Sequence, residues 1–252
     1  MDSSTSSSRQ VSASLKGRTM KILERELKLV KDFIVDFDSF AKNGYNMRYE
    51  FNKHGWMSFF DVLNGPCYTT LVKDFWVRAE IMKGTKEGRE MEIRSSVMGI
   101  EITISQSTIA KLIVLDNTGF FETDSNLIRS KFGDDIKSTL YKVVEEKVGG
   151  ENEEDVNGCK KKVDKATNMY DMERILFKFF IQCIFSRVGS TDQPNRIHKV
   201  IFLNLHKNAK VNLAEYVFHH LCTTIDNSWR TQHKSIPYPR LLSELFHQSK
   251  VI

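Results

Sequence analysis

The sequence predicts a mainly α-helical globular domain with one small β-hairpin near residues 91–104. Apolar residues recur at three- and four-residue steps along most of the chain, which is the spacing of amphipathic helices. Hydrophobic residues make up 40% and charged residues 27% of the 252 residues, a balance typical of a protein that buries a core. The β-branched residues around Met98-Gly99 are the one place where a strand pair is expected.

The chain divides into a tail and one domain. Residues 1–17 are rich in serine and have almost nothing to bury, so they are expected to form a disordered tail. Residues 18–252 are expected to form a single helical domain. Within it, the stretch 149–168 has neither apolar periodicity nor bulk and is expected to be an exposed linker.

Three helices are expected before the hairpin. A long amphipathic helix is predicted over residues 20–43, where apolar residues are spaced by three or four with charges between them. A short aromatic helix over 56–63 ends at Asn64-Gly65-Pro66, a strong stop signal. A further helix is predicted over 71–79, continuing up to Gly84.

The hairpin leads into a capped helix. EIRSSV and IEITI flank the turn at Met98-Gly99 and are rich in strand-forming residues. Ser105 stands before an apolar run and is predicted to cap a helix over residues 105–115. Two shorter helices are predicted over 127–132 and 136–148.

The C-terminal part is the most regular. Residues 172–188 are apolar nearly all round and predict a buried central helix. A second helix is predicted behind Pro194, and a third over 213–229 with apolar residues in steps of four. The last helix begins at Pro237 and Pro239 and shows no cap or glycine before the chain end, which points to a C-terminally truncated fragment.

Cysteine usage and the N-terminus predict an intracellular protein. The four cysteines stand far apart without a CxxC pair, which favours reduced, buried thiols. The N-terminus lacks the apolar core of a signal peptide, and no apolar run reaches the roughly 18 residues of a membrane span. We therefore expect a nuclear or cytoplasmic protein that is not secreted and has no membrane partner.

Three stretches carry a resemblance to a known family: HGWMSFFDVLNGPCYTTLVKDFWVRAEI, EIRSSVMGIEITISQSTIAKLIVL and ILFKFFIQCIFSRVGSTDQPNRIHKVIFLNLHKNAKVNLAEYVFHHL. In this order they resemble the plant transposon protein domain family, found in proteins encoded by plant transposons and retrotransposons. The resemblance runs from about His54 to Leu245. It implies an element-derived protein, and the family offers neither an established activity nor catalytic residues to carry over.

Acidic residues are candidates for the two-metal site of strand-transfer enzymes. They stand in two groups: Asp32, Asp36 and Asp38, and Asp134 and Asp135. Strand transfer of the RNase H type needs carboxylates on adjacent strands of a sizeable mixed sheet, whereas these lie on predicted helices or at a helix start. Solvated helix charges and a cap are the favoured interpretation, and no catalytic residue is assigned.

Histidine and cysteine residues are candidate zinc ligands. His219 and Cys222 stand three residues apart, near His198, His206 and His220, and could share a helix face. No second close pair at finger-like or HExxH spacing completes a site. Cys222 also falls in line with the apolar residues of its predicted helix, so a core position is favoured and no metal site is assigned.

Neither a nucleophile nor a cofactor motif is found. Cys183 lies in FFIQCIF, where apolar burial raises the pKa of a thiol and lowers its reactivity. The patterns GxxxxGK[ST], GxGxxG and GxSxG do not occur. We therefore predict no cofactor and favour a protein that is not an enzyme.

Basic residues are concentrated towards the C-terminal end. The net charge is +5, and between Arg187 and Lys250 nine Lys and Arg residues stand against four Asp and Glu residues. The lysine-rich CKKKVDKA is partly cancelled by acidic residues at 151–155, so a solvated linker is its favoured interpretation. The candidate phosphate contacts, for which ordinary helix exteriors are the alternative, are Arg187, Arg196, Lys199, Lys207, Lys210 and Arg230.

The function predicted from these features is binding. We expect a non-enzymatic, transposable-element-derived helical module that binds other protein chains or, weakly and without sequence preference, nucleic acid. One alternative is a degenerate element remnant without a cellular role. The other is an element-encoded enzyme whose site is not recognised.

Overall fold

A computed structural model describes residues 19–83, 90–142, 165–185 and 192–252. Within these residues the fold is mainly α-helical with a small antiparallel sheet, as predicted. The predicted tail at 1–17, the linker up to residue 164 and Arg187 lie outside the described residues. Of the helices in the described residues, none combines the length and apolar composition that a membrane crossing requires.

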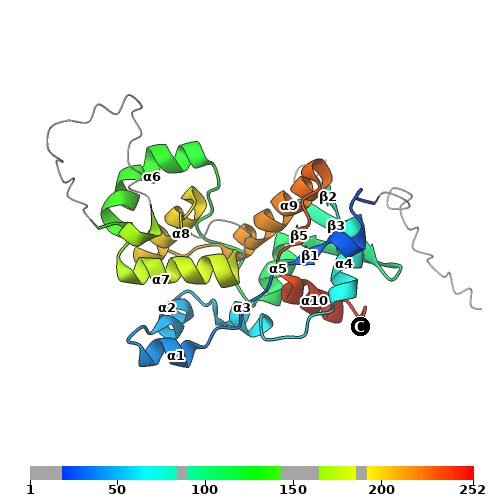
Figure 1. Cartoon of the computed structure of the whole chain (residues 1–252), viewed down its shortest axis with the longest axis horizontal. Helices are drawn as coiled ribbons and strands as arrows, with labels where there is room; N and C mark the ends of the chain where they lie inside the picture. The colour runs from blue at the N-terminus through cyan, green and yellow to red at the C-terminus, as the bar shows by residue number, and fades with distance from the viewer. Residues whose placement is uncertain (1–18, 84–89, 143–164, 186–191) are drawn as a thin grey trace, which may run out of the picture.

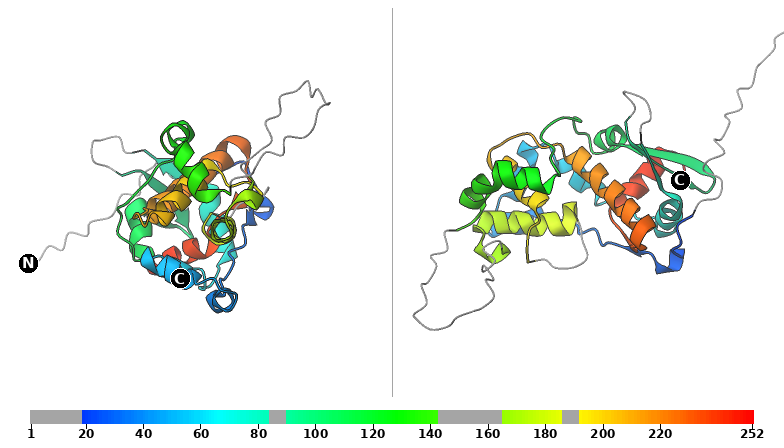
Figure 2. Two further views of the ribbon diagram at one scale, coloured as in Figure 1. Left: turned by 90° about the vertical axis from the view of Figure 1, so that its left-hand side faces the viewer. Right: turned by 90° about the horizontal axis from the view of Figure 1, so that it is seen from above.

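The helices and strands lie in two groups at opposite ends of the molecule (Figures 1 and 2). One group consists of helices α1 (Phe37–Lys42), α2 (Met47–Lys53), α6 (Ser125–Leu140), α7 (Asp171–Phe179) and α8 (Arg196–His206). The other consists of α4 (Thr69–Arg78), α10 (Pro239–Gln248) and strands β2 (Glu80–Met82), β3 (Glu92–Val97) and β4 (Ile100–Ser105). Between them lie α3 (Met57–Val62), α5 (Gln106–Leu112) and α9 (Leu213–Thr231), which packs on α5 and reaches β2.

The hairpin is confirmed, and a third strand joins it. β3 and β4 pair antiparallel around a two-residue turn in which Met98 (φ 50°) and Gly99 (φ 83°) both have positive φ. Helix α4 ends at Arg78 rather than continuing to Gly84, and β2 then pairs with β3. A three-residue strand is too short for its own alternation to be read from sequence, which is why β2 was not predicted.

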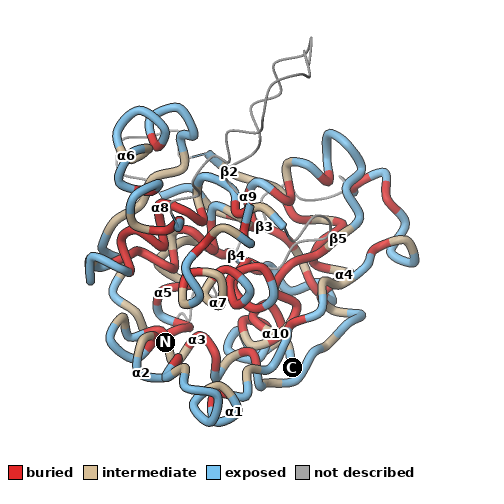
Figure 3. Tube along the Cα trace, turned by 60° about the vertical axis from the view of Figure 1, so that its left-hand side comes forward, coloured by how far each residue is buried: buried red, intermediate tan, exposed pale blue. Residues whose placement is uncertain are grey.

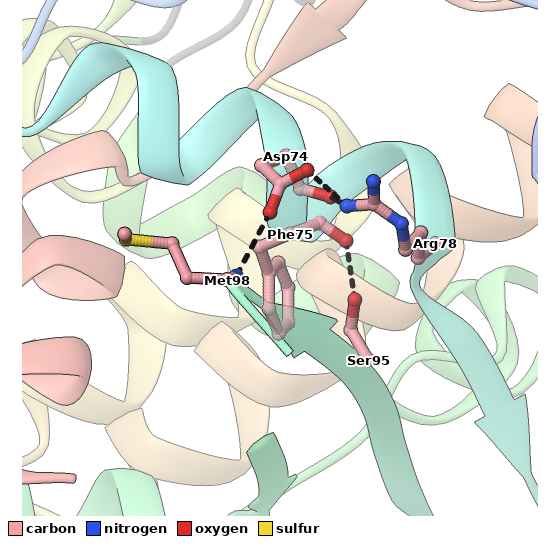
Figure 4. A network of polar contacts seen from close by, with 5 residues as sticks. All are labelled: Asp74, Phe75, Arg78, Ser95 and Met98. Carbon is pink, nitrogen blue, oxygen red and sulfur yellow. Dashed lines mark hydrogen bonds and ion pairs between the residues drawn. The ribbon is translucent and has the colours of Figure 1, made fainter. Parts of the chain in front are cut away.

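Polar contacts tie the hairpin to α4 (Figure 4). The Asp74 carboxylate accepts a hydrogen bond from the backbone N–H of Met98 at 3.2 Å and also pairs with the Arg78 guanidinium. The buried hydroxyl of Ser95 donates to the carbonyl of Phe75 at 2.6 Å. Both the tip and the middle of the hairpin are therefore fixed to one helix.

The prediction of a long helix over residues 20–43 is wrong. Only α1 is α-helical there, and the preceding residues form an extended strap with a 3-10 turn at Glu24–Glu26 and a short strand, β1 (Lys28–Leu29). β1 pairs in parallel with β5 (Ser235–Ile236). Outside the 3-10 turn, the strap hydrogen-bonds to distant backbone, because tertiary pairing overrides the helical spacing of its apolar residues.

Helix α6 replaces two predicted helices. It is continuous from Ser125 to Leu140, begins at the N-cap Asp124 and passes through Gly133 without a break. The chain then leaves the helix at Tyr141, which forms an isolated antiparallel bridge with Met169. The predicted continuation over 143–148 lies outside the described residues.

The remaining predicted helices agree with the structure in order and position, whereas α2 was not predicted. The side chains of Ser105, Asn195 and Asn212 cap α5, α8 and α9 by accepting backbone N–H groups. Helix α7 continues directly into a π turn at Phe180–Ile184, which is buried except at Gln182. The α-helical part itself buries only Glu173, Phe177 and Phe179, so the expectation of burial nearly all round is corrected there. The expectation that the last helix ends uncapped is wrong, because Val251 N–H and Lys250 N–H return to carbonyls of the last turn with Lys250 left-handed.

The core is aromatic at the helical end. The rings of Phe51 and Phe60 lie 4.8 Å apart between centroids, and Phe179 lies 5.4 Å from Phe51. Figure 3 shows buried residues gathered in the interior, while α1 and α6 present mostly exposed surface. Helix α6 is thus a peripheral helix that rests on α8.

Candidate nucleic-acid interface

A basic pocket of about 470 Å³ lies between α6 and α8. Both helices contribute charged side chains to its walls, and buried isoleucines form the apolar part. The lining residues are Ile128, Arg129, Gly133, Asp134, Ile136, Lys137, Arg196 and Lys199.

The α6 wall follows from helical spacing. Arg129, Gly133 and Lys137 are four residues apart, so they lie on one face of the helix. Gly133 leaves room between the two cations, since a Cβ added there would meet no atom within 4 Å. The buried Ile128 and Ile136, which also line the pocket, pack α6 against the rest of the protein.

The α8 wall consists of two cations of different exposure. Arg196 is exposed, and its Nη1 donates a hydrogen bond to the carbonyl of Ser125 at 3.3 Å, which links the first turns of the two helices. Lys199 is only 7% exposed, and its Nζ lies 5.3 Å from the centroid of the Tyr141 ring. The prediction of Lys199 as an exterior phosphate contact is therefore corrected: it is a buried cation in the floor of the pocket.

The charges of the pocket favour an anion. Four cationic side chains face one carboxylate, that of Asp134, among the lining residues. Arg129 and Lys137 are both exposed, and neither forms an ion pair with another described residue. Arg and Lys donors converging from two helices are suited to the oxygens of a phosphate.

The other predicted basic residues are paired with carboxylates. Lys207 lies 2.6 Å from Asp135, and Arg230 lies 2.9 Å from Asp226 at the far end of α9. Lys210 lies 2.8 Å from Asp116, and its hydrogen bond lowers the pKa of that carboxyl. The structure thus brings only Arg196 and Lys199 of the described candidates into one site.

The acidic candidates occupy separate places. Asp36 caps α1 by accepting the N–H of Ser39 at 2.9 Å, and Asp38 lies 3.5 Å from Arg48. Asp32 is buried in the strap. Asp134 and Asp135 are exposed on α6, so the two groups do not meet.

The histidine and cysteine candidates differ in burial: His198 and Cys222 are buried, whereas His206 and His219 are exposed. His219 and Cys222 line one small pocket near the sheet, yet within the described residues no three His, Cys, Asp or Glu side chains are grouped to hold a metal ion. Burial raises the thiol pKa of both Cys183 and Cys222 to about 12. Cys67, by contrast, is exposed, which corrects the expectation of buried thiols for that position.

Two residues of the pocket were missed by sequence reasoning. Arg129 and Lys137 are eight residues apart, and dividing this stretch into two helices hides that they share a face. The signal that would have found them is the spacing Arg129, Gly133, Lys137, which becomes visible once α6 is read as one helix.

Comparisons with known proteins add no further identification. No protein-family model matches the chain, and neither a curated protein nor a solved structure matches it.

Proposed function

We propose that this chain is a non-enzymatic binding module that holds the phosphate backbone of a nucleic acid at the pocket between α6 and α8. One observation carries the proposal: four basic side chains from two helices surround one pocket that contains a single carboxylate. Contacts to phosphate oxygens supply most of the affinity in sequence-tolerant nucleic-acid binding.

The composition of the pocket favours phosphate over base recognition. Its apolar lining residues are the isoleucines at 128 and 136, and no aromatic ring is among the lining residues on which a base would stack. The positive charge of its four basic residues instead suits the negative charge of backbone phosphates. Binding is therefore expected to tolerate changes of sequence. The origin in a plant transposable element stays a prediction from the resemblance of residues 54–245.

Two matched triple variants test the proposal. The first reverses the three exposed cations of the pocket, Arg129→Glu, Lys137→Glu and Arg196→Glu. The control reverses three cations already paired with carboxylates: Lys207→Glu, Lys210→Glu and Arg230→Glu. Both triple variants change the net charge equally, so a difference in their DNA affinity reflects the pocket and not the overall charge.

The measurement is the salt dependence of duplex DNA binding. Each phosphate contact contributes a slope of about 0.9 in log affinity against log salt, so three contacts weaken binding about 40-fold between 50 and 200 mM salt. We expect the pocket variant to lose this slope and the control to retain it. Equal losses of affinity in the two variants would show that the pocket is not a nucleic-acid site. Absence of DNA binding by the native chain at low ionic strength would show the same. Association with another protein chain would then be the favoured function.

A further inference from the structure

A second pocket, of about 310 Å³, lies between α2, α7 and the C-terminal end of α8. Its character differs from that of the basic pocket, because apolar side chains form part of its wall and Lys53 is the one permanent cation among the described residues that line it. Phe51 and Phe202 are each 1% exposed and form part of the wall with Met172, Leu176 and Leu205. The volume is near the lower end of the range of about 300 to 1,000 Å³ for small-molecule sites.

A buried carboxylate stands in this apolar wall. The side chain of Glu173, in the first turn of α7, is 9% exposed. Its one ion pair with the described residues is to Nδ1 of His206, at 3.5 Å, and that imidazole is cationic only when protonated. His206 is itself 57% exposed at the mouth of the pocket. Glu173 therefore has no permanent positive partner among the described residues, although burying an unpaired carboxylate is costly.

The rest of the polar lining does not supply that partner. Lys53 is 3.5 Å from Glu50, so its charge is already shared with a second carboxylate at the rim. Burial lowers the pKa of His54, which favours its neutral form. Counting Glu50 and Glu173 against Lys53, the lining is negative when the imidazoles are neutral.

We propose that this pocket binds an organic ammonium group: a primary amine carried on a small apolar body, with the ammonium at Glu173 and the body against Phe51 and Phe202. A charge-assisted bond to the carboxylate and contact with aromatic walls are the interactions that such a ligand makes best. The same chemistry is offered by a free aromatic amine and by a lysine side chain. The site is separate from the basic pocket and does not depend on the function proposed for it.

The test uses the full chain and a pair of probes of equal shape. 2-Phenylethylammonium and the neutral 2-phenylethanol are titrated separately, with binding followed by NMR shifts of the Met172 methyl and the His206 ring. We expect the ammonium to bind at least tenfold more tightly than the alcohol. Equal affinity of the two probes, or shifts from neither probe, would overturn the proposal without requiring any variant.

Matched variants then test the carboxylate. Glu173→Gln removes one negative charge from the pocket, and Asp171→Asn removes one from the same helical turn but outside the pocket lining. We expect a loss of affinity for 2-phenylethylammonium of at least tenfold in the first and less than twofold in the second. Equal effects would overturn the assignment of Glu173. A third probe, N-acetyl-lysine methylamide, distinguishes the source, since tighter binding than the aromatic amine identifies a lysine side chain.

Discussion

The carboxylate of Asp32 caps helix α10 across 208 residues of sequence. Its Oδ2 accepts a hydrogen bond from the backbone N–H of Arg240 at 3.1 Å, while the adjacent N-cap residue, Tyr238, makes no side-chain cap of its own. The other oxygen, Oδ1, is buried without a partner among the described residues. Asp32 therefore both holds the strap to the last helix and buries a charge.

Replacement of Asp32 by Asn should change how stability depends on pH. Burial raises the pKa of Asp32 from 3.8 to about 6, so the folded protein binds more protons than the unfolded chain between these values. Native stability is then favoured below pH 4 and is lost as pH rises to 6, by at most about 3 kcal/mol. Asp32→Asn should remove this loss and be more stable than the native protein at pH 7, as measured by urea unfolding.

Asp38→Asn is the control for this experiment, because Asp38 is an exposed carboxylate in the adjoining helix. We expect its unfolding curves to follow those of the native protein at each pH. A native protein whose stability rises between pH 4 and 6 relative to Asp32→Asn would contradict the raised pKa.

Leu23 and Leu27 distinguish the strap from a helix. They are four residues apart, so one helical face would bury both, yet the strap leaves Leu23 53% exposed and Leu27 2% exposed. Leu27→Ala should lower the free energy of unfolding by about 2 to 4 kcal/mol. Leu23→Ala should change it by less than about 0.5 kcal/mol. Similar losses in both variants, measured by chemical denaturation, would favour the helix.

A substitution of Met98 in the hairpin turn should increase stability. Its side chain is 73% exposed and its φ is positive, a conformation that Asn adopts more readily. Met98→Asn should stabilise the protein by about 0.5 to 1 kcal/mol. Gly99→Ala should destabilise it by about 1 kcal/mol through φ alone, since a Cβ there meets no atom within 4 Å. Thermal melts of the two variants should shift in opposite directions.

Charge reversal should lower stability by different amounts at the two cations of the α8 wall. Lys199→Glu places a carboxylate in a buried position and should cost about 3 to 5 kcal/mol of stability. Arg196→Glu alters an exposed side chain and should cost less than about 1 kcal/mol. Circular dichroism during urea unfolding measures both. A Lys199→Glu protein with native stability would show that this side chain reaches solvent.

Local signals made much of the fold predictable. The cap at Ser105 and the turn at Met98-Gly99 act within a few residues, so the elements next to them could be placed from sequence. The strap could not be, because its hydrogen-bond partners near Lys234 are contributed by the other end of the chain.

The candidate site was predictable only in part, for a related reason. Arg196 was found because the basic residues of the C-terminal third were counted together. Lys199 was included on the same basis, although its burial depends on the packing of Tyr141 and α6. The cations of α6 lie outside that basic third and join the site only through the packing of α6 on α8. No linear pattern encodes that pairing.

The parallel pairing of β1 with β5 has a consequence for synthesis on the ribosome. Lys28 is the strand partner of Ser235, and the carboxylate of Glu26 lies 2.8 Å from Nζ of Lys234. During synthesis, the strap stays unpaired until the segment near residue 235 has left the exit tunnel. Contacts this distant are slow to form. Until residues near 235 have been made, the apolar residues of the strap lack their native partners and favour the binding of chaperones.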